Sequence, residues 1–227
     1  MRRPITGATV FGLSSGMPRP TSPRITRATA VRAALDAIDE AGLDTFRLGS
    51  VARRLNVSTP SLYHHFRHRG EILAEVARLI LMQAEPSGRS RQADWRESLV
   101  ELSVSVRRSI LRHPKAAPLL LMYPPRLLAL QDYERSLRLF EREGVPTELH
   151  MTIVSGLESL VFGSALLLAS TRAQGVELFP VFDTASYPAL TAAIQCNPLN
   201  DEATFIRASR GFLAGICPAA AEKSQPA

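Results

Sequence analysis

The chain has 227 residues, 45% of them hydrophobic, and this composition is ordinary for a globular protein and excludes a chain that is disordered throughout. Its net charge of +6 lies entirely in the first third, since residues 1–84 contain 12 arginines and 6 acidic residues, whereas residues 85–227 contain 15 of each sign. A local excess of cations attracts a polyanion, which is either a nucleic acid or an anionic membrane surface.

Cys196 and Cys217 have no spacing typical of a disulfide framework or a metal site, and this predicts reduced thiols in the cytoplasm. The longest apolar stretch, residues 160–169, is half of the ~20 residues that span a bilayer. The segment after Arg2 and Arg3 is too weakly apolar for a signal peptide. We therefore expect a cytoplasmic protein that has no transmembrane helix and does not bind membranes.

Residues 1–24 are rich in Pro, Gly, Ser, Thr and Arg, which predicts a flexible basic arm. This arm is either a tail without function or a segment that brings Arg19, Arg24 and Arg27 to the minor groove of DNA. Met17 is an alternative start of translation, in which case part of the arm does not belong to the protein.

Residues 25–84 predict a compact domain of helices, because apolar residues recur at steps of three and four. The first helix should end at Gly42, which suits a left-handed C-terminal residue, and the last should stop before Pro86. The helices are expected over residues 26–41, 48–55, 59–66 and 71–84. The first three form a helix-turn-helix domain, and the fourth leads into the rest of the chain.

Residues 89–217 predict a larger helical domain, followed by a flexible tail over residues 218–227. Its helices are expected over residues 92–112, 115–123, 126–143, 147–172, 184–195 and 200–216. No segment alternates with a period of two, and no repeat recurs at a fixed spacing. The fold class is therefore predicted to be all-α.

Residues 47–66 have the pattern of a helix-turn-helix, in which two short helices meet at a tight turn. Ala52 is small where the two helices approach each other, and Leu62 and Phe66 supply the apolar contacts between them. Asn56 stands at the turn, where the backbone needs a positive φ that Asn tolerates better than most residues other than glycine.

The second helix of this motif should begin with a cap from Ser58 or Thr59, whose hydroxyl accepts from a free N–H, and Pro60 suits its first turn. With Leu62 and Phe66 inward, the other side chains of the helix face outward, and short polar groups at a helix N-terminus suit the major groove. The outward residues are Thr59, Pro60, Ser61, Tyr63 and His64.

Two other interpretations of the segment remain open. It is an ordinary helical hairpin of a core, with Tyr63 and the histidines merely at the surface, or His64 and His68 bind a metal from consecutive turns. No cysteine or carboxylate lies nearby at the spacing of a zinc site, so we expect no metal and no cofactor. The basic charge, the turn residue and the outward polar face together favour DNA binding.

Residues 26–84 resemble the DNA-binding domain of the TetR family of repressors. The resemblance lies in Val51-Ala52, Leu55-Asn56-Val57-Ser58, Ser61-Leu62-Tyr63-His64-His65-Phe66 and the turn Arg67-His68-Arg69. It implies that the third helix enters the major groove and that Tyr63, His64, His65 and Arg69 hold phosphates. Gly49 and Arg47 depart from the family pattern at the second helix, which places base contacts from that helix in doubt. The predicted DNA-binding residues are Arg47, Ser50, Ser58, Thr59, Pro60, Ser61, Tyr63, His64, His65 and Arg69.

The C-terminal part is similar to the tetracycline-repressor-like subgroup of this family, mainly in its layout and in Leu111-Arg112-His113-Pro114. This implies a homodimer built from the last two long helices and a ligand cavity within residues 92–172. Gly156 and Gly163 lie on one helix face and allow close packing, either with a partner or within the chain. The predicted ligand-binding residues are His113, Pro118, Met122, Tyr123, Phe140, Met151 and Phe162.

These features predict a homodimeric repressor that binds a palindromic operator and is released by a small, largely apolar effector through a shift of the helix over residues 71–84. One alternative is a DNA-binding dimer without small-molecule control. An all-α enzyme is disfavoured, because we find no nucleophile elbow, no phosphate-binding glycine loop and no paired metal carboxylates. Glu158, inside an apolar stretch, is expected to anchor a ligand or an arginine.

Overall fold

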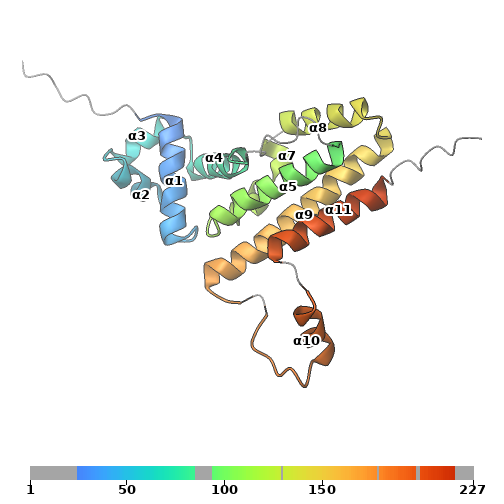
Figure 1. The fold of residues 1–227 in the computed structure, drawn as a ribbon. Helices are drawn as coiled ribbons and strands as arrows, with labels where there is room; N and C mark the ends of the chain where they lie inside the picture. Colours follow the sequence, from blue (N-terminus) through green and yellow to red (C-terminus); the bar gives the residue numbers. More distant parts are fainter. Residues whose placement is uncertain (1–24, 85–93, 129, 178, 198–199, 218–227) are drawn as a thin grey trace, which may run out of the picture.

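The computed structural model describes residues 25–84, 94–128, 130–177, 179–197 and 200–217, and these residues form eleven helices and no strand. The helices are α1 (Arg27–Ala41), α2 (Leu48–Arg54), α3 (Thr59–Tyr63), α4 (Arg69–Met82), α5 (Trp95–Arg112), α6 (Leu119–Met122), α7 (Pro125–Leu128), α8 (Leu130–Arg142), α9 (Thr147–Gln174), α10 (Pro188–Gln195) and α11 (Asp201–Ile216) (Figure 1). The all-α prediction is confirmed. The predicted arm with Arg19 and Arg24, the alternative start at Met17, the linker with Pro86 and the tail over residues 218–227 lie outside the described residues.

Helix α1 begins and ends with the local signals that its sequence contains. Thr26 and Thr29 form a reciprocal capping box, in which the Thr26 hydroxyl accepts from the backbone N–H of Thr29 at 3.1 Å. Gly42 ends the helix with a φ of 87°, and its N–H donates to the carbonyl of Ile38 at 2.7 Å. The predicted end at Gly42 is therefore confirmed.

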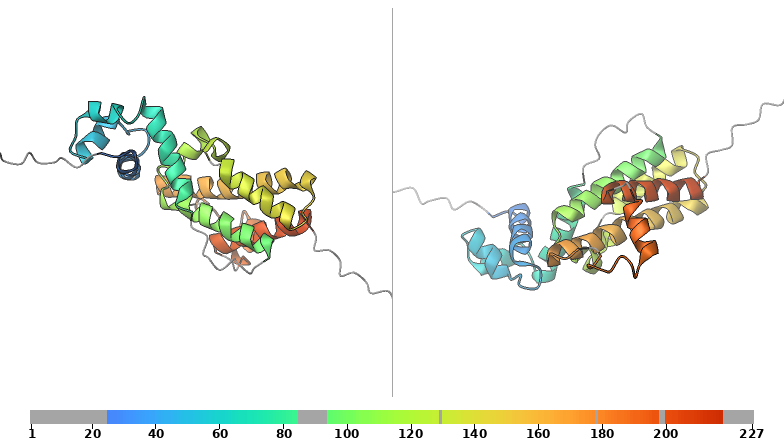
Figure 2. Two further views of the ribbon diagram at one scale, coloured as in Figure 1. Left: turned by 90° about the horizontal axis from the view of Figure 1, so that it is seen from above. Right: turned by 60° about the horizontal axis from the view of Figure 1, so that its bottom comes forward.

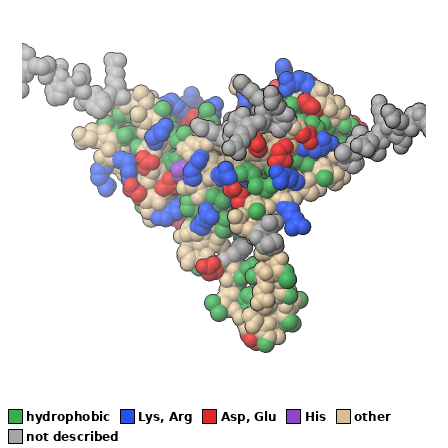
Figure 3. Space-filling view, in the orientation of Figure 1, with side chains coloured by type: hydrophobic (Ala, Val, Ile, Leu, Met, Phe, Trp, Pro, Cys, Tyr) green, Lys and Arg blue, Asp and Glu red, His purple; other side chains and the backbone are tan. Residues whose placement is uncertain are grey.

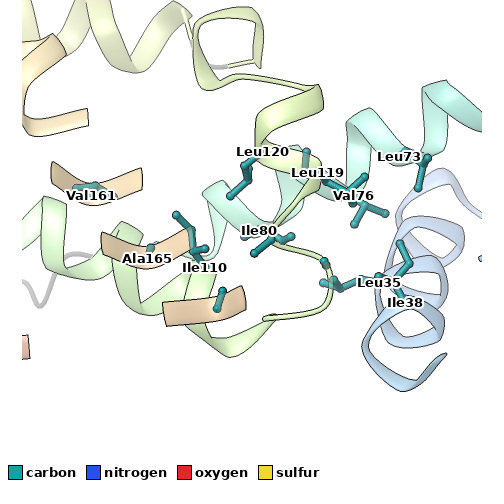
Figure 4. Packing of buried hydrophobic residues seen from close by; sticks show 14 of the residues in the cluster. Leu35, Ile38, Leu73, Val76, Ile80, Ile110, Leu119, Leu120, Val161 and Ala165 are labelled. Atoms are coloured by element: carbon teal, nitrogen blue, oxygen red, sulfur yellow. The ribbon is translucent and has the colours of Figure 1, made fainter. Parts of the chain in front are cut away.

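The first four helices pack around a common core, with α1 lying against α2 and α4. Leu35 and Ile38 of α1 face Leu73 and Val76 of α4 in this core (Figure 4). Farther along α4, Ile80 meets Ile110, Leu119 and Leu120 (Figure 4). One hydrophobic core thus continues along α4 from the first four helices into the rest of the molecule.

Helices α5, α9 and α11 lie side by side and form the body of the C-terminal part (Figures 1 and 2). The guanidinium group of Arg107 is buried among them, where it donates to the Ser164 hydroxyl at 3.1 Å, pairs with Asp201 and lies over the ring of Phe205. A buried charge needs such partners, because removing it from water without them costs several kcal/mol. Arg107 therefore holds α5, α9 and α11 in one arrangement.

The face of α9 that contains Gly156 packs inside the chain. A Cβ atom at Gly156 would come within 1.9 Å of the Phe212 ring on α11, so any larger residue would force that ring to move. Gly163 lies two helical turns farther along the same face, and a Cβ atom there would contact nothing within 4 Å. Of the two predicted close-packing positions, Gly156 therefore serves an intramolecular contact.

Helix α10 stands away from the three-helix body (Figures 1 and 2). The segment that leads to it and the helix itself expose large apolar side chains, among them Val181, Tyr187 and Ile194 (Figure 3). An exposed apolar projection of this kind is typical of a contact with another molecule.

Several helix boundaries differ from those expected. The predicted helix over 126–143 corresponds to α7 and α8, which adjoin residue 129, outside the described residues. The predicted helix over 115–123 is reduced to α6, because Pro118 limits the backbone at its start. The predicted helix 59–66 ends as α3 at Tyr63, and α4 begins at Arg69 instead of Glu71. These differences lie at helix ends, where local signals are weakest.

One described helix, α9, is long and apolar enough to cross a membrane by length and composition alone, a test that a core helix also passes, so this finding does not contradict the expectation of no transmembrane helix. The apolar part of α9 extends beyond residues 160–169, because mainly uncharged residues flank it and Glu158 adds one charge. Helix α9 packs against α5 and α11, yet only 22% of its most apolar window is buried. Much of its apolar surface is left without a cover within one chain.

Candidate DNA-binding surface and effector cavity

The turn between α2 and α3 has the backbone geometry that the sequence predicted. Asn56 adopts a φ of 53°, the one positive φ of a non-glycine residue in the described chain. The N–H of Val57 donates to the carbonyl of Ala52 at 2.9 Å and closes the turn. Leu62 and Phe66 are buried, so α3 is held at a fixed angle on the core.

The opposite side of α3 is open to solvent. Pro60, Tyr63 and His64 are exposed, with Tyr63 at 53%, and Thr59 and Ser61 are half-buried beside them. Ser58 is at the capping position but makes no capping hydrogen bond; its hydroxyl contacts that of Ser61 at 2.8 Å. The predicted cap from Ser58 or Thr59 is therefore wrong, and Pro60, which has no N–H, reduces the need for one.

The start of α4 is fixed by a cluster of polar contacts under α3. Arg27 donates to Glu71 at 2.8 Å and to Glu75 at 3.1 Å, and its guanidinium group lies 4.6 Å from the centre of the Phe66 ring. A hydrogen bond from the backbone N–H of Arg67 and the contact with Arg27 lower the pKa of the Glu71 carboxyl below its ordinary value. Arg27 is thus engaged within the chain and is not part of a free arm.

His68 caps α4, since its Nδ1 accepts from the backbone N–H of Glu71 at 3.2 Å. His64, the other member of the predicted His64–His68 pair, is exposed at the C-terminal end of α3. Within the described residues, no group of three His, Cys, Asp or Glu side chains is placed to hold a metal ion.

A cavity of about 440 Å³ opens between the last turn of α4 and helices α5, α7, α8 and α9. Most of its lining is apolar, and its volume falls within the range of small-molecule pockets. The lining residues are Leu81, Met82, Ala84, Leu99, Leu102, Ser103, Val106, Pro125, Asp132, Tyr133, Arg135, Ser136, Phe140, Val154, Leu157, Glu158, Val161 and Phe162. Helix α4 therefore begins beneath α3 and ends at the cavity.

The polar side of the cavity is organised around Glu158 of α9. Its carboxylate accepts from Arg126 at 2.9 Å and from the hydroxyl of Tyr133. Burial, followed by the hydrogen bond to Glu158, raises the pKa of Tyr133 above its ordinary value, so its phenol stays protonated. Of the two expected partners of Glu158, a ligand or an arginine, the structure shows the arginine, Arg126.

The cavity end of α4 is tied to α1 by a histidine. His113, which follows α5, contacts Asp39 of α1 through Nδ1 at 2.6 Å and Gln83 at the end of α4 through Nε2 at 2.9 Å. Next to it, Lys115 donates to the carbonyl of Glu40 at 2.7 Å. The loop after α5 thus holds the C-terminal ends of α1 and α4 together.

The comparisons with known proteins agree with this arrangement. Residues 87–218 match the family model described as "Tetracyclin repressor-like, C-terminal domain", and residues 30–76 match the one described as "Bacterial regulatory proteins, tetR family". The chain belongs to the TetR family. It is a DNA-binding transcriptional regulator and not an enzyme.

Relatives of this TetR-family regulator include tetracycline repressors. It is 23% identical to the tetracycline repressor protein class D of Escherichia coli over 85% of this chain and 89% of that one. It is 34% identical to the class A repressor from transposon 1721 of Escherichia coli, over 39% of this chain and only 42% of that relative. The structure of ActR from Streptomyces coelicolor in complex with actinorhodin superposes with a TM-score of 0.67 at 25% identity, covering 85% of this chain and 96% of ActR.

The predicted DNA-binding residues of this TetR-family regulator fall into two groups. The α3 group forms one surface. In the second group, which lies outside α3, Arg47 donates to the backbone carbonyls of Asp44 and Phe46, and the Ser50 hydroxyl donates to the backbone carbonyl of Arg47. Arg69 lies over the ring of Phe46, with its guanidinium carbon 5.5 Å from the ring centre. The members of the α3 group are Ser58, Thr59, Pro60, Ser61, Tyr63, His64 and His65.

Two exposed arginines near α3 were not among the predicted residues. The guanidinium groups of Arg53 on α2 and Arg67 after α3 form no hydrogen bond or ion pair with the described residues. Their signal in the sequence is the local excess of arginine, which does not say which arginines are used within the chain, as Arg27 is.

Of the seven predicted ligand-binding residues, Phe140 and Phe162 line the cavity. The other five lie elsewhere. His113 contacts the C-terminal ends of α1 and α4, and Tyr123 lies near Gly70 at the start of α4. Pro118, Met122 and Met151 are exposed. Sequence reasoning chose aromatic and sulfur residues near helix breaks and missed the aliphatic positions on α5 and α9. Their only signal is a spacing of three and four, which core positions share.

Proposed function

We propose that this regulator is a homodimeric, ligand-responsive repressor that binds a palindromic operator and is released by a small, largely apolar effector. The proposal assigns DNA binding to residues 25–84 and effector binding and dimerisation to residues 89–217. The observation that carries it is helix α4, which begins beneath the exposed face of α3 and ends at the apolar cavity. A ligand that alters the end of α4 would move the base of α3.

The DNA contact is assigned to the exposed face of α3. Short polar side chains there suit base edges, whereas Tyr63, His64 and the nearby Arg53 and Arg67 suit phosphates. Arg47, Ser50 and Arg69 are assigned to the same surface on the family resemblance, and they would have to release or share their present hydrogen bonds. Phosphate contacts displace counterions, so the affinity should fall steeply with salt.

The dimer contact is assigned to the outer faces of α9 and α11. Helix α9 leaves Leu167 and the open position at Gly163 uncovered, and α11 exposes small residues at Ala208, Gly211 and Gly215. Small side chains allow helices to approach closely, and apolar surface of this extent favours a covering partner. A twofold dimer would place two α3 helices at the ~34 Å spacing of successive major grooves.

The effector site is assigned to the 440 Å³ cavity. ActR, whose structure is similar, was solved in complex with actinorhodin, and a TetR variant from Acinetobacter baumannii with minocycline. Both complexes support a small organic molecule as the effector. We infer that the protein acts in the cytoplasm, where its operator is, and needs no cofactor.

The first test measures binding of the purified protein to a labelled DNA fragment from upstream of its own gene. Electrophoretic retardation is compared at two salt concentrations, with random DNA of equal length as competitor. A Tyr63→Phe, Arg69→Ala double variant removes two assigned phosphate contacts, and a Glu177→Gln variant, in the exposed segment after α9, is the control. Specific retardation that weakens with salt and in the double variant supports the proposal.

No retention above random DNA at either salt concentration would contradict the assignment of that operator, and genome-wide selection of bound fragments would then decide whether any operator exists. Sedimentation equilibrium tests the dimer, since a Leu167→Asp, Gly163→Asp variant should be monomeric. Retardation that no small molecule reverses would favour the alternative, a DNA-binding dimer without effector control.

A further inference from the structure

One polar side chain in the wall of the cavity has no protein partner. Ser103 is in the middle of α5, is only 6% exposed, and lines the cavity. Its hydroxyl forms no hydrogen bond with any of the described residues, although Ser109, six positions later, donates to the carbonyl of Ile80. Because no group of the described residues uses this hydroxyl, a ligand that pairs with it gains affinity and specificity.

The charged groups at the cavity are already neutralised. Glu158 is paired with Arg126, and Asp132 with Arg135 at 2.9 Å. An anionic ligand would therefore meet Glu158 and Asp132 without a free cation, and a cationic ligand would have to compete with Arg126 or Arg135. Placing an unpaired charge in an apolar site is far more costly than placing a neutral polar group there.

The remaining hydrogen-bonding capacity at the cavity is that of neutral groups. Tyr133 uses its proton for Glu158, so its oxygen is left as an acceptor, and Ser103 offers both a donor and an acceptor. A hydroxyl group satisfies either partner, because it donates and accepts. The rest of the lining is mainly aliphatic and aromatic, which favours a ring system or a short hydrocarbon chain.

We propose that the effector of this cavity is an uncharged, mainly apolar molecule that carries a hydroxyl group, and that Ser103 selects it over charged and fully apolar analogues. This inference rests on the proposed function, since it names the ligand class of the same effector site. It adds a specific residue, Ser103, and a specific charge state to the ligand.

The test uses four fluorescent probes with one ring skeleton: 9-anthracenemethanol, 9-methylanthracene, anthracene-9-carboxylate and protonated 9-(aminomethyl)anthracene. Their affinities for the purified full-length protein are measured by fluorescence titration. The alcohol should bind about 3- to 10-fold more tightly than the methyl compound, as expected for one neutral hydrogen bond. The two charged probes should bind at least about 10-fold more weakly than the alcohol.

Two variants assign the preference to one side chain. In Ser103→Ala the advantage of the alcohol over the methyl compound should vanish, while the affinity of the methyl compound stays within about 2-fold. Ser159→Ala is the matched control, because Ser159 is exposed on α9 and its hydroxyl donates to the carbonyl of Ser155 at 2.8 Å. This variant should keep the ranking of all four probes.

The possible failures are distinguishable. Equal affinities for the alcohol and the methyl compound, tighter binding of a charged probe, or no binding of any probe would overturn the ligand class. In each case, salt-dependent operator binding in the same preparation without a probe would leave the DNA-binding part of the proposed function intact. Absence of operator binding combined with the expected probe ranking would instead contradict the proposed function and leave the cavity assignment standing.

Discussion

In the N-terminal half, the residues assigned to DNA lie mostly within a single stretch of 47–69, whereas the cavity of the C-terminal half is lined by residues from five helices between Leu81 and Phe162. The first site depends on one turn and one short helix held on a local core. The second depends on how helices distant in sequence come together. Sequence reasoning therefore assigned the first surface residue by residue, whereas it placed the cavity only by region.

The two halves also differ in how much of their apolar surface is buried within a single chain. Helices α1 to α4 bury their apolar faces among themselves and against the α5–α6 region. Helix α9 and the projection that includes α10 keep large apolar surfaces exposed. The first four helices thus cover their apolar faces within one chain, whereas α9 and the α10 projection leave apolar surface that the proposed partner would cover.

The largest expected effect is that of Phe66→Ala, which tests whether the two halves can be separated. Phe66 is 1% exposed beneath α3 and carries Arg27 on its ring. The loss should be about 3–5 kcal/mol in the free energy of unfolding, with loss of operator binding. Urea unfolding followed by circular dichroism measures the first and electrophoretic retardation the second. Tyr63→Phe should leave stability within about 0.5 kcal/mol.

Because few cavity residues belong to α4, the Phe66→Ala protein should still bind the anthracene alcohol. Simultaneous loss of probe binding would mean that the halves fold as one unit, and the comparison would then fail.

His113→Ala tests the connection between the halves. It removes the contacts to Asp39 and Gln83 and leaves the Asp39 carboxylate partly buried without its partner, at a cost of about 1.5–3 kcal/mol. Operator affinity should become insensitive to the effector, as measured by retardation with and without ligand. Lys115→Ala, which removes a neighbouring surface hydrogen bond, should keep the response. Unchanged coupling in His113→Ala would show that α4 alone transmits the signal.

Asn56→Ala sharpens the contrast at the level of the backbone. An alanine at a φ of 53° should cost about 1 kcal/mol, because its Cβ disfavours the left-handed region, whereas Asn56→Gly should be tolerated. Thermal unfolding of the three proteins measures the difference. Equal destabilisation by Ala and Gly would mean that the side chain of Asn56, and not its backbone, matters.

The smallest effect concerns pH and is confined to the N-terminal half. The folded-state pKa of Glu71 is lowered, so its contribution to stability is present above about pH 4.5 and is lost as the pH falls through the folded value. Between about pH 6 and 3.5, Glu71→Gln should therefore lose less stability than the wild type in urea unfolding. The same loss in both proteins would show that the contact with Arg67 and Arg27 does not stabilise the carboxylate. Glu177→Gln is the exposed control.

Most helices could be predicted from the periodicity of apolar residues and from the positions of Gly and Pro. For α1, the sequence also predicted the end of the helix at Gly42. The turn at Asn56 was also predicted, because a positive φ restricts the residue type at one position. The Ser58 cap was not, since a serine has several possible partners and here contacts Ser61. Helix ends set by short turns, such as those of α3 and α6, likewise depend on the surrounding packing.

The sequence by itself determined the all-α class, the helix-turn-helix, the basic N-terminal third and the family, because each follows from residues that are near one another in the chain. Only the tertiary structure decided which arginines are engaged, that Gly156 receives Phe212, and which side chains surround the cavity. Ser103 illustrates the reason. A serine on an apolar helix face looks like a core residue in the sequence, and only the arrangement of five helices around it places it in the wall of a cavity.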